Sequence, residues 1–167
     1  MSYICKIPTI KEMNEKWDYE IEIHSNKDNW IKWKKEWLKN TKEKKIIPYY
    51  GILDGNIICE ITVSIDKSVV QNSVGLVDER TAYLNSFRTK KEYQGQGYFS
   101  KLFHFVINDL KEKGYEAVTL GVEPNETKNM QIYFHYGFDE YIKSGIEFYP
   151  DGVEAFVLYY KKSIDNL

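Results

Sequence analysis

The sequence predicts a mixed α/β (α+β) protein with a mostly antiparallel sheet of six to seven strands and flanking helices. Strand-like and helix-like segments follow one another in the order β-α-α-β-β-β-α-β-α-β-β. Asp54-Gly55, between two apolar runs, is the signal of a tight antiparallel hairpin. Residues 117–122 form a near-continuous apolar run, which is typical of a buried strand that lies parallel to its neighbour.

The N-terminal segment predicts a short strand and a capped helix. Residues 3–7 are strand-like, and Pro8 ends the strand because proline cannot donate to a sheet. Thr9 and Glu12 stand at capping-box spacing, so their side chains can satisfy N–H groups at a helix start. We expect this helix to run to about Trp17.

A second helix carries three tryptophans. Asn26 or Asp28 could cap its start, and we expect it to run to about Asn40. Three tryptophans recur at helical spacing and therefore share one face: Trp30, Trp33 and Trp37. We expect these rings to pack in the core. The alternative is that they form a wall of a ligand pocket, because aromatic faces also hold cationic or apolar ligands.

The middle of the chain predicts strands. Residues 49–53 and 57–65 flank the hairpin turn and read as its two strands. The polar stretch 67–78 is expected to be a loop, with a short strand at 73–77. The next expected strand covers residues 81–89.

Two helices and two strands complete the expected fold. They are a helix from Tyr98 to a C-cap at Gly114, a helix over 126–136 stopped by Gly137, and strands over 138–143 and 153–161. Pro150-Asp151-Gly152 supplies the turn between these strands.

Length and composition predict one globular domain over residues 1–167. A chain of this length can bury a sizeable core. Hydrophobic residues make up 43% and charged residues 29%, which is the balance of an ordinary globular protein. The net charge of −2 gives no reason to expect a nucleic-acid partner.

The cysteines and histidines predict neither a disulfide framework nor a metal site. Cys5 and Cys59 are too few for such a framework, and we expect Cys59 to be a buried free thiol. The three histidines show no metal-ligand spacing and are expected to be surface or core residues: His24, His104 and His135.

Hydropathy predicts no association with a membrane. No apolar stretch approaches the roughly 20 residues that span a bilayer, and the N-terminal segment lacks a signal-peptide pattern. We therefore expect a cytoplasmic protein, for which a homodimer is one arrangement.

The segment Gln94-Gly95-Gln96-Gly97 lies between the strand over 81–89 and the helix that begins near Tyr98. Glycines at such a turn let the backbone approach a ligand closely. The N–H groups at a helix start, together with the helix dipole, then favour an anion such as a phosphate. The alternative is an ordinary glycine-containing turn.

Two blocks resemble the GNAT superfamily of acyl-CoA-dependent N-acyltransferases. Gln94 and Gly97 match the first and fourth positions of its Gln/Arg-x-x-Gly-x-Gly/Ala signature, whereas Phe99 departs from the sixth. Residues 132–138, Ile-Tyr-Phe-His-Tyr-Gly-Phe, resemble the family's Leu-Tyr-x-x-x-Gly-Phe block, and residues 120–123 resemble the strand before it. Together the blocks cover about the second half of the chain.

The resemblance implies a fold, a donor and a set of contacts. Two central parallel strands, over 81–89 and 117–122, should splay apart around acetyl-CoA (coenzyme A), the acyl donor, with no metal. The backbone of Phe87, Arg88 and Thr89 should line the pantetheine arm, with its unpaired groups at the splay. The further cofactor-binding residues implied are Gln94, Gly95, Gln96, Gly97, Tyr98, Phe99, Ser100 and Asn125.

The implied reaction is direct transfer of an acetyl group to a primary amine of a small molecule. Tyr133 matches the family's acid position, and a phenol can give a proton to the leaving thiolate; the alternative is a buried packing residue. The amine must also lose a proton to a base. Five carboxylates near predicted strand ends could accept it, although each could equally be a surface group: Glu60, Asp66, Asp78, Glu79 and Glu123.

The sequence does not identify the acyl acceptor. An acidic cluster near the first helix would suit a polycation such as a polyamine or aminoglycoside, although acidic helix surfaces are common: Glu12, Glu15, Asp18, Glu20 and Glu22. One alternative function is an acyl-CoA-binding sensor or interaction module with little turnover. A nucleotide-binding protein is disfavoured, because the turn matches neither phosphate-loop pattern of such proteins.

Overall fold

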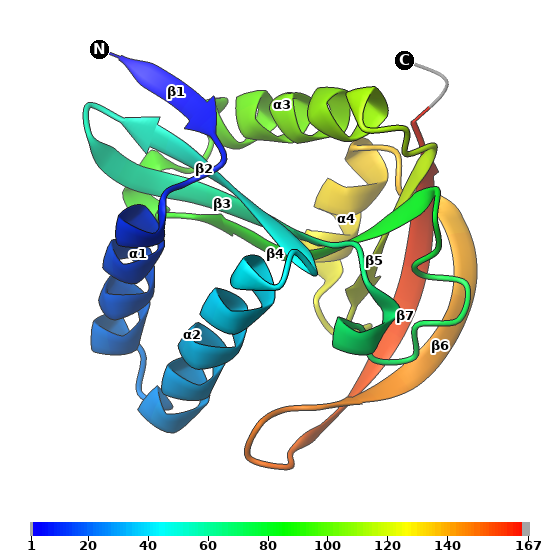
Figure 1. The fold of residues 1–167 in the computed structure, drawn as a ribbon. Helices are drawn as coiled ribbons and strands as arrows, with labels where there is room; N and C mark the ends of the chain where they lie inside the picture. Colours follow the sequence, from blue (N-terminus) through cyan, green and yellow to red (C-terminus); the bar gives the residue numbers. More distant parts are fainter. Residues whose placement is uncertain (1, 165–167) are drawn as a thin grey trace. The chain divides into compact units, whose positions relative to one another are not determined.

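The computed structural model describes residues 2–164 and contains, within them, seven strands, four α-helices and two short 3₁₀ helices (Figure 1). In chain order they are β1 (Tyr3–Lys6), α1 (Ile10–Ile23), α2 (Lys27–Lys42), β2 (Ile46–Leu53), β3 (Asn56–Ser64), η1 (Lys67–Val69), β4 (Thr81–Thr89), η2 (Lys91–Tyr93), α3 (Tyr98–Glu112), β5 (Ala117–Val122), α4 (Thr127–His135), β6 (Glu140–Phe148) and β7 (Glu154–Ser163). This order of strands and α-helices confirms the predicted order.

The strands are hydrogen-bonded in the order β1-β2-β3-β4-β5-β7-β6. The β4–β5 pair is parallel and the sheet is otherwise mostly antiparallel, which confirms the predicted fold class. The parallel register runs from Thr81↔Ala117 to Tyr83↔Thr119 and stops there, although both strands continue. The two strands therefore part after Tyr83, as the resemblance implied.

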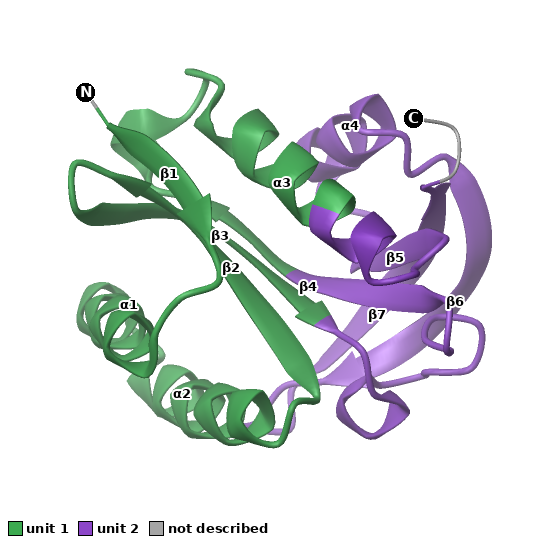
Figure 2. Ribbon diagram, turned by 45° about the horizontal axis from the view of Figure 1, so that its top comes forward, with its two compact units in different colours: residues 1–63, 86–108 green, residues 64–85, 109–167 purple. Residues whose placement is uncertain are grey.

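The chain divides into two compact units (Figure 2). Unit 1 comprises residues 1–63 and 86–108, and unit 2 comprises residues 64–85 and 109–167. Each has its own apolar cluster, centred on Met13, Tyr50 and Ile52 in unit 1 and on Leu76, Val157 and Tyr159 in unit 2. A single domain over residues 1–167 stays a prediction.

Helix α1 begins as predicted but extends further. The Thr9 hydroxyl accepts from the Glu12 N–H at 3.2 Å, and the Glu12 carboxylate accepts from the Thr9 N–H at 2.8 Å, so the capping box forms. The predicted end near Trp17 is wrong, because the helix continues to Ile23. The charged Glu20 continues its buried face and so breaks the apolar pattern on which that prediction rested.

Helix α2 packs its tryptophan face against α1. Trp30 is buried, and its ring centroid lies 6.0 Å from that of Trp17, which also lies 6.0 Å from Trp37. This confirms the expected core packing for Trp30, whereas Trp33 and Trp37 are half-buried. Asn26 is the N-cap residue, but its side chain makes no capping hydrogen bond and instead accepts from Trp30 Nε1 at 2.9 Å.

Two predicted elements of unit 2 are wrong in type or extent. Residues 73–77 form a turn instead of a strand, closed by the Leu76 N–H donating to the Ser73 carbonyl at 2.9 Å. The strand expected over 138–143 is β6, which runs on to Phe148. The sequence does not predict the second half of β6, because exposed apolar residues break the alternation that is typical of a half-buried strand.

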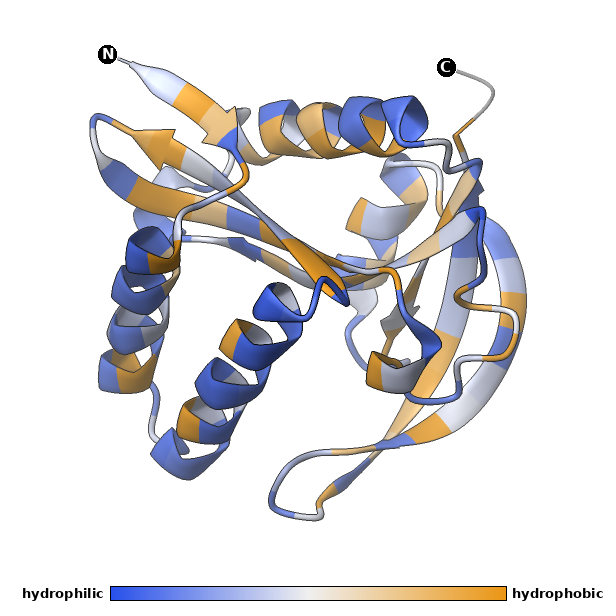
Figure 3. Cartoon of the chain, in the orientation of Figure 1, coloured by the Kyte–Doolittle hydropathy of each residue, from blue (hydrophilic) through white to orange (hydrophobic). Residues whose placement is uncertain are grey.

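Helix α3 shows one apolar face, and its bands of hydrophobic and hydrophilic residues contrast with the mostly hydrophilic α1 and α2 (Figure 3). Leu102, Val106 and Leu110 recur every four residues and are completely buried. Burial of this stripe fixes the helix that begins directly after the glycine turn.

Replacing Thr9 with alanine should lower the free energy of unfolding by about 1 kcal/mol, because it removes one capping acceptor. Thermal or denaturant unfolding measures the change. Thr9→Ser is the matched control, since it keeps the hydroxyl and should stay close to the parent protein. An alanine variant as stable as the parent would show that the capping box contributes nothing.

Candidate active site

The glycine turn of unit 1 exposes backbone N–H groups directly before a helix. Gly95 and Gly97 have φ values of 75° and 86°, in the left-handed region that favours glycine. The N–H groups of Gly95, Gln96 and Gly97 donate to none of the described residues, and these residues are exposed. Because α3 begins directly afterwards, at Tyr98, its dipole adds to the attraction for an anion.

The departure from the signature at Phe99 is accommodated by packing. The half-buried Phe99 ring lies 5.5 Å from the Phe87 ring and 6.4 Å from the Phe103 ring, centroid to centroid. The bulk of Phe99 therefore belongs to an aromatic cluster of unit 1.

The flanks of the turn are tied by glutamine side chains. Gln94 Nε2 donates to the Thr89 carbonyl at 3.1 Å, and Gln96 Nε2 donates to the Glu92 carbonyl at 3.0 Å. The first bond joins the turn to the end of β4. The structure thus keeps the expected cofactor residues from Phe87 to Ser100 within unit 1, whereas Asn125 and Tyr133 belong to unit 2.

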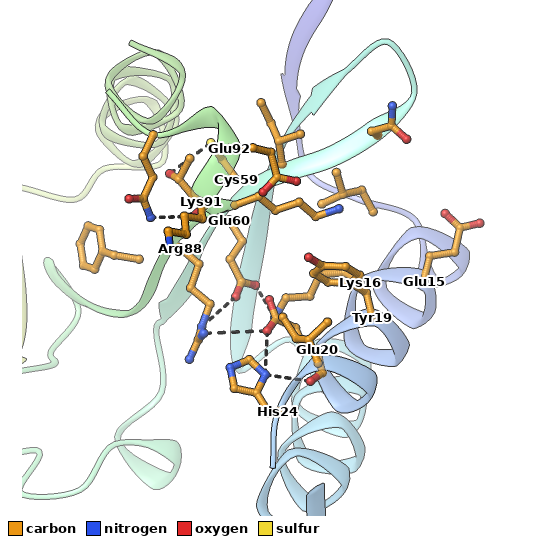
Figure 4. A pocket seen from close by; sticks show the side chains of 18 of the residues that line it. Glu15, Lys16, Tyr19, Glu20, His24, Cys59, Glu60, Arg88, Lys91 and Glu92 are labelled. Carbon is orange, nitrogen blue, oxygen red and sulfur yellow. Dashed lines mark hydrogen bonds and ion pairs between the residues drawn. The ribbon is translucent and has the colours of Figure 1, made fainter. Parts of the chain in front are cut away.

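A cavity of about 520 Å³ lies in unit 1 between α1, the β2–β3 turn with β3, and the end of β4 (Figure 4). Its walls include Phe87, Arg88 and Thr89, the residues expected along the pantetheine arm, and also Gln94. The cavity therefore borders the predicted path of the acyl donor.

A network of charges forms one wall of this cavity (Figure 4). Lys16 Nζ lies 2.6 Å from Glu60 Oε2, and both side chains are almost completely buried. Arg88 lies between two carboxylates, with Nε 3.7 Å from Glu60 Oε1 and Nη1 3.8 Å from Glu20 Oε2. His24 Nδ1 lies 3.3 Å from the same Glu20 oxygen. Burial lowers the pKa of Lys16, while the Glu60 carboxylate opposes that shift.

Sequence reasoning missed much of this wall. The sequence predicts Glu60 only as a candidate base and Arg88 only for its backbone, expects His24 to be a surface or core residue, and gives Lys16 no role. A signal was present, because Lys16, Glu20 and His24 recur every four residues and so share one face of α1.

In unit 2, Tyr133 lies half-buried on α4. It lies close enough to Tyr83 to contribute to that residue's raised pKa, whose main causes are burial and then the Glu147 carboxylate. Glu147 Oε2 accepts from the Tyr159 hydroxyl at 2.6 Å and lies 3.5 Å from the Tyr83 hydroxyl. Tyr83 is also the last residue of β4 in register with β5, so this cluster lies where the parallel pair opens.

The five candidate bases differ in their surroundings. Glu123 follows β5, and burial raises the pKa of its carboxyl, with a further contribution from the Glu126 carboxylate. A raised pKa suits a general base. Glu123 also makes side-chain contacts with Glu126 and Tyr149. Of the other four, Glu60 pairs with Lys16, Asp66 accepts from Ser68, Asp78 accepts from Arg80, and Glu79 is exposed.

The remaining candidates show no further site. Asn125 lies exposed between β5 and α4. Cys59 is a free, buried thiol, as predicted. Within residues 2–164, no group of three or more histidine, cysteine, aspartate or glutamate side chains is arranged to hold a metal ion. In the same part of the chain, no helix combines the length and apolar character needed to cross a membrane.

One family profile and many solved structures match this chain. The profile of the Acetyltransferase (GNAT) family matches residues 9–138. No curated protein matches the chain in sequence.

Three similar structures illustrate the likeness. An N-acetyltransferase from Staphylococcus aureus Mu50 is 12% identical, with a TM-score of 0.71 over 99% of this chain and 100% of that chain. The ribosomal-protein-S18-alanine N-acetyltransferase from Escherichia coli is 16% identical, with a TM-score of 0.69 over 99% of each chain. The PaiA N-acetyltransferase from Thermoplasma acidophilum, in complex with coenzyme A, is 15% identical, with a TM-score of 0.64 over 98% of this chain and 99% of that chain. At these identities the likeness shows the fold alone.

Replacing Gly97 with valine should weaken coenzyme A binding about tenfold or more, because a β-branched residue resists the left-handed conformation and obstructs close approach. Calorimetry measures the affinity. Gly152→Val is the matched control, since Gly152 has the same φ of 86° and equally open surroundings. Both variants should lose about 1–3 kcal/mol of stability through backbone strain. A folded Gly97→Val protein with parental affinity would contradict a binding role for the turn.

Proposed function

Because the chain belongs to the Acetyltransferase (GNAT) family, we propose that it transfers an acetyl group from acetyl-CoA to a primary amine of a small molecule. The observation that carries this proposal is the exposed turn with left-handed Gly95 and Gly97 directly before α3. Its N–H groups suit a pyrophosphate, which is an anion in need of several donors.

Four parts of direct transfer have a candidate group in the chain: binding of the pyrophosphate, binding of the pantetheine arm, deprotonation of the amine and protonation of the thiolate. The turn from Gln94 to Ser100 binds the pyrophosphate, and the backbone of Phe87, Arg88 and Thr89 pairs with the amides of the pantetheine arm. The Glu123 carboxylate accepts a proton from the acceptor ammonium, so the nitrogen lone pair becomes free to attack the thioester carbonyl. As the carbon–sulfur bond breaks, its electron pair goes to sulfur, and Tyr133 protonates the departing thiolate. The nitrogen loses its second proton to solvent, which leaves a neutral amide, and the Tyr133 phenolate takes a proton back from solvent.

The experiment that tests the proposal is a screen of amines with acetyl-CoA and detection of the released thiol. Because one structural neighbour is a ribosomal-protein-alanine N-acetyltransferase, the screen should include peptides with free N-termini beside small amines. Thiol release that depends on a small primary amine supports the proposal. Coenzyme A binding without transfer to any amine would instead favour an acyl-CoA sensor.

Replacing Tyr133 with phenylalanine should lower kcat by about 10²–10⁴-fold, because the ring remains but the proton is lost. Acetyl-CoA affinity should stay nearly constant. Tyr136→Phe is the control, since Tyr136 is also half-buried and lies at the end of the same helix. A Tyr133→Phe protein with parental kcat, measured where chemistry limits turnover, would make Tyr133 a packing residue.

The pH dependence of kcat/KM should carry the titration of Glu123. A carboxyl with a raised pKa keeps its proton to higher pH, so it accepts a proton only above that pKa. The rate should therefore rise with pH through a limb above the ordinary glutamate value of about 4.3. Glu123→Gln should remove this limb and lower the rate, whereas the exposed Glu79→Gln should change neither. An unchanged profile in Glu123→Gln would assign the base elsewhere.

A further inference from the structure

We propose that the cavity of unit 1 is the acceptor site and that it takes an amine which also carries a carboxylate, as a free amino acid does. The inference rests on the proposed transfer reaction and names the acceptor class. It comes from the charged cavity wall formed by Glu20, Glu60 and Arg88 (Figure 4).

The charges that line the cavity are balanced. Four carboxylates and four cationic side chains contribute to the walls, beside His24: Glu15, Glu20, Glu60 and Glu92, with Lys16, Arg88, Lys90 and Lys91. A polycation would be attracted to an acidic cavity. A balanced lining instead suits a ligand that carries both signs of charge.

The acidic cluster of α1 does not supply a separate polycation site. Glu12 lies 3.0 Å from Lys6 and takes part in the capping box. Asp18 lies 2.6 Å from Lys34. Glu15 and Glu20 line the cavity, where Glu20 lies opposite Arg88. The charges of the cluster are therefore partly neutralised and spread over several contacts.

Arg88 is placed to bind a carboxylate. Its guanidinium carbon lies 4.4 Å from the centre of the Trp30 ring, a cation–π contact that favours this position of the group. Its distances of 3.7 and 3.8 Å to the two carboxylates exceed hydrogen-bond length, and it makes no hydrogen bond with the described residues. The side chain is 42% exposed, so its donors remain available for a bidentate anion.

Two buried carboxylate oxygens are placed to bind an ammonium. Glu60 Oε1 and Glu20 Oε2 have no hydrogen-bond partner among the described residues, and the Glu60 side chain is only 4% exposed. Buried polar atoms normally have such a partner. Both oxygens also lie beside the Arg88 guanidinium, so receptors for an ammonium and for a carboxylate adjoin, as the two charges adjoin in an amino acid.

The test compares amino acids with the amines left when their carboxylate is removed: glycine with methylamine, alanine with ethylamine, and lysine with cadaverine. In the parent protein, kcat/KM should be about tenfold or more higher for the preferred amino acid than for its amine. Arg88→Gln should abolish this preference, while Arg88→Lys should retain part of it. The control is Arg80→Gln, because Arg80 pairs with Glu116 at an exposed site of unit 2 and should not affect the preference.

A binding measurement separates this inference from the proposed function. Because Arg88 lies on Trp30, amino-acid binding should change tryptophan fluorescence of the coenzyme A complex, and Glu20→Gln should weaken the titration about tenfold. Amino-acid binding without any acetyl transfer would overturn the transferase proposal and leave the site assignment standing. The inference would be overturned if kcat/KM were equal for each amino acid and its amine and did not change in Arg88→Gln. The charge network would then be purely structural. Absence of binding in a folded, coenzyme A-binding protein would overturn it as well.

Discussion

The buried ion pair between Lys16 and Glu60 is the interaction on which the arrangement of unit 1 depends. It joins α1 to β3 at 2.6 Å, with both side chains almost removed from solvent. Removing one partner would leave an uncompensated buried charge, at a cost of about 3–5 kcal/mol. Because separating the two charges is costly, the pair limits how far α1 can shift over the sheet, and the position of α1 defines one wall of the cavity. Two apolar residues could hold the same helix at lower desolvation cost.

The same pair also determines what Arg88 can do. With Glu60 Oε2 committed to Lys16, only Oε1 faces Arg88, and Glu20 offers its own Oε2 from α1. Neither contact is short enough to hold the guanidinium as a hydrogen-bonded partner would. The guanidinium also lies on the ring of Trp30, which α2 buries against Trp17. An arginine that lies on an aromatic face and makes no side-chain hydrogen bond with the described residues is suited to a planar anion.

The sequence was sufficient for the fold but only partly for the site. Patterns local to a few residues, such as the Asp54-Gly55 hairpin and the apolar run of β5, predicted elements correctly. The end of α1 was missed because Glu20 continues a buried face with a charge. The contact between Glu60 and Arg88 depends on the register of β3 against β4, which local patterns do not specify. Residue type alone could therefore not show that Arg88 faces a cavity.

The alternation of side chains along β4 directs neighbouring residues to opposite faces of the strand. Phe87 packs toward Phe99 at the start of α3, whereas the next residue, Arg88, turns toward Glu60 and α1. Thr89 returns to the first side, where its hydroxyl lies 3.4 Å from Cys59 Sγ. The side chains of this segment thus point to the two faces of the strand, so an extended ligand along it would have to pair with backbone groups, of which the Thr89 carbonyl already accepts from Gln94. If the proposed roles hold, a donor bound by that backbone and an acceptor bound by Arg88 meet at the same few residues.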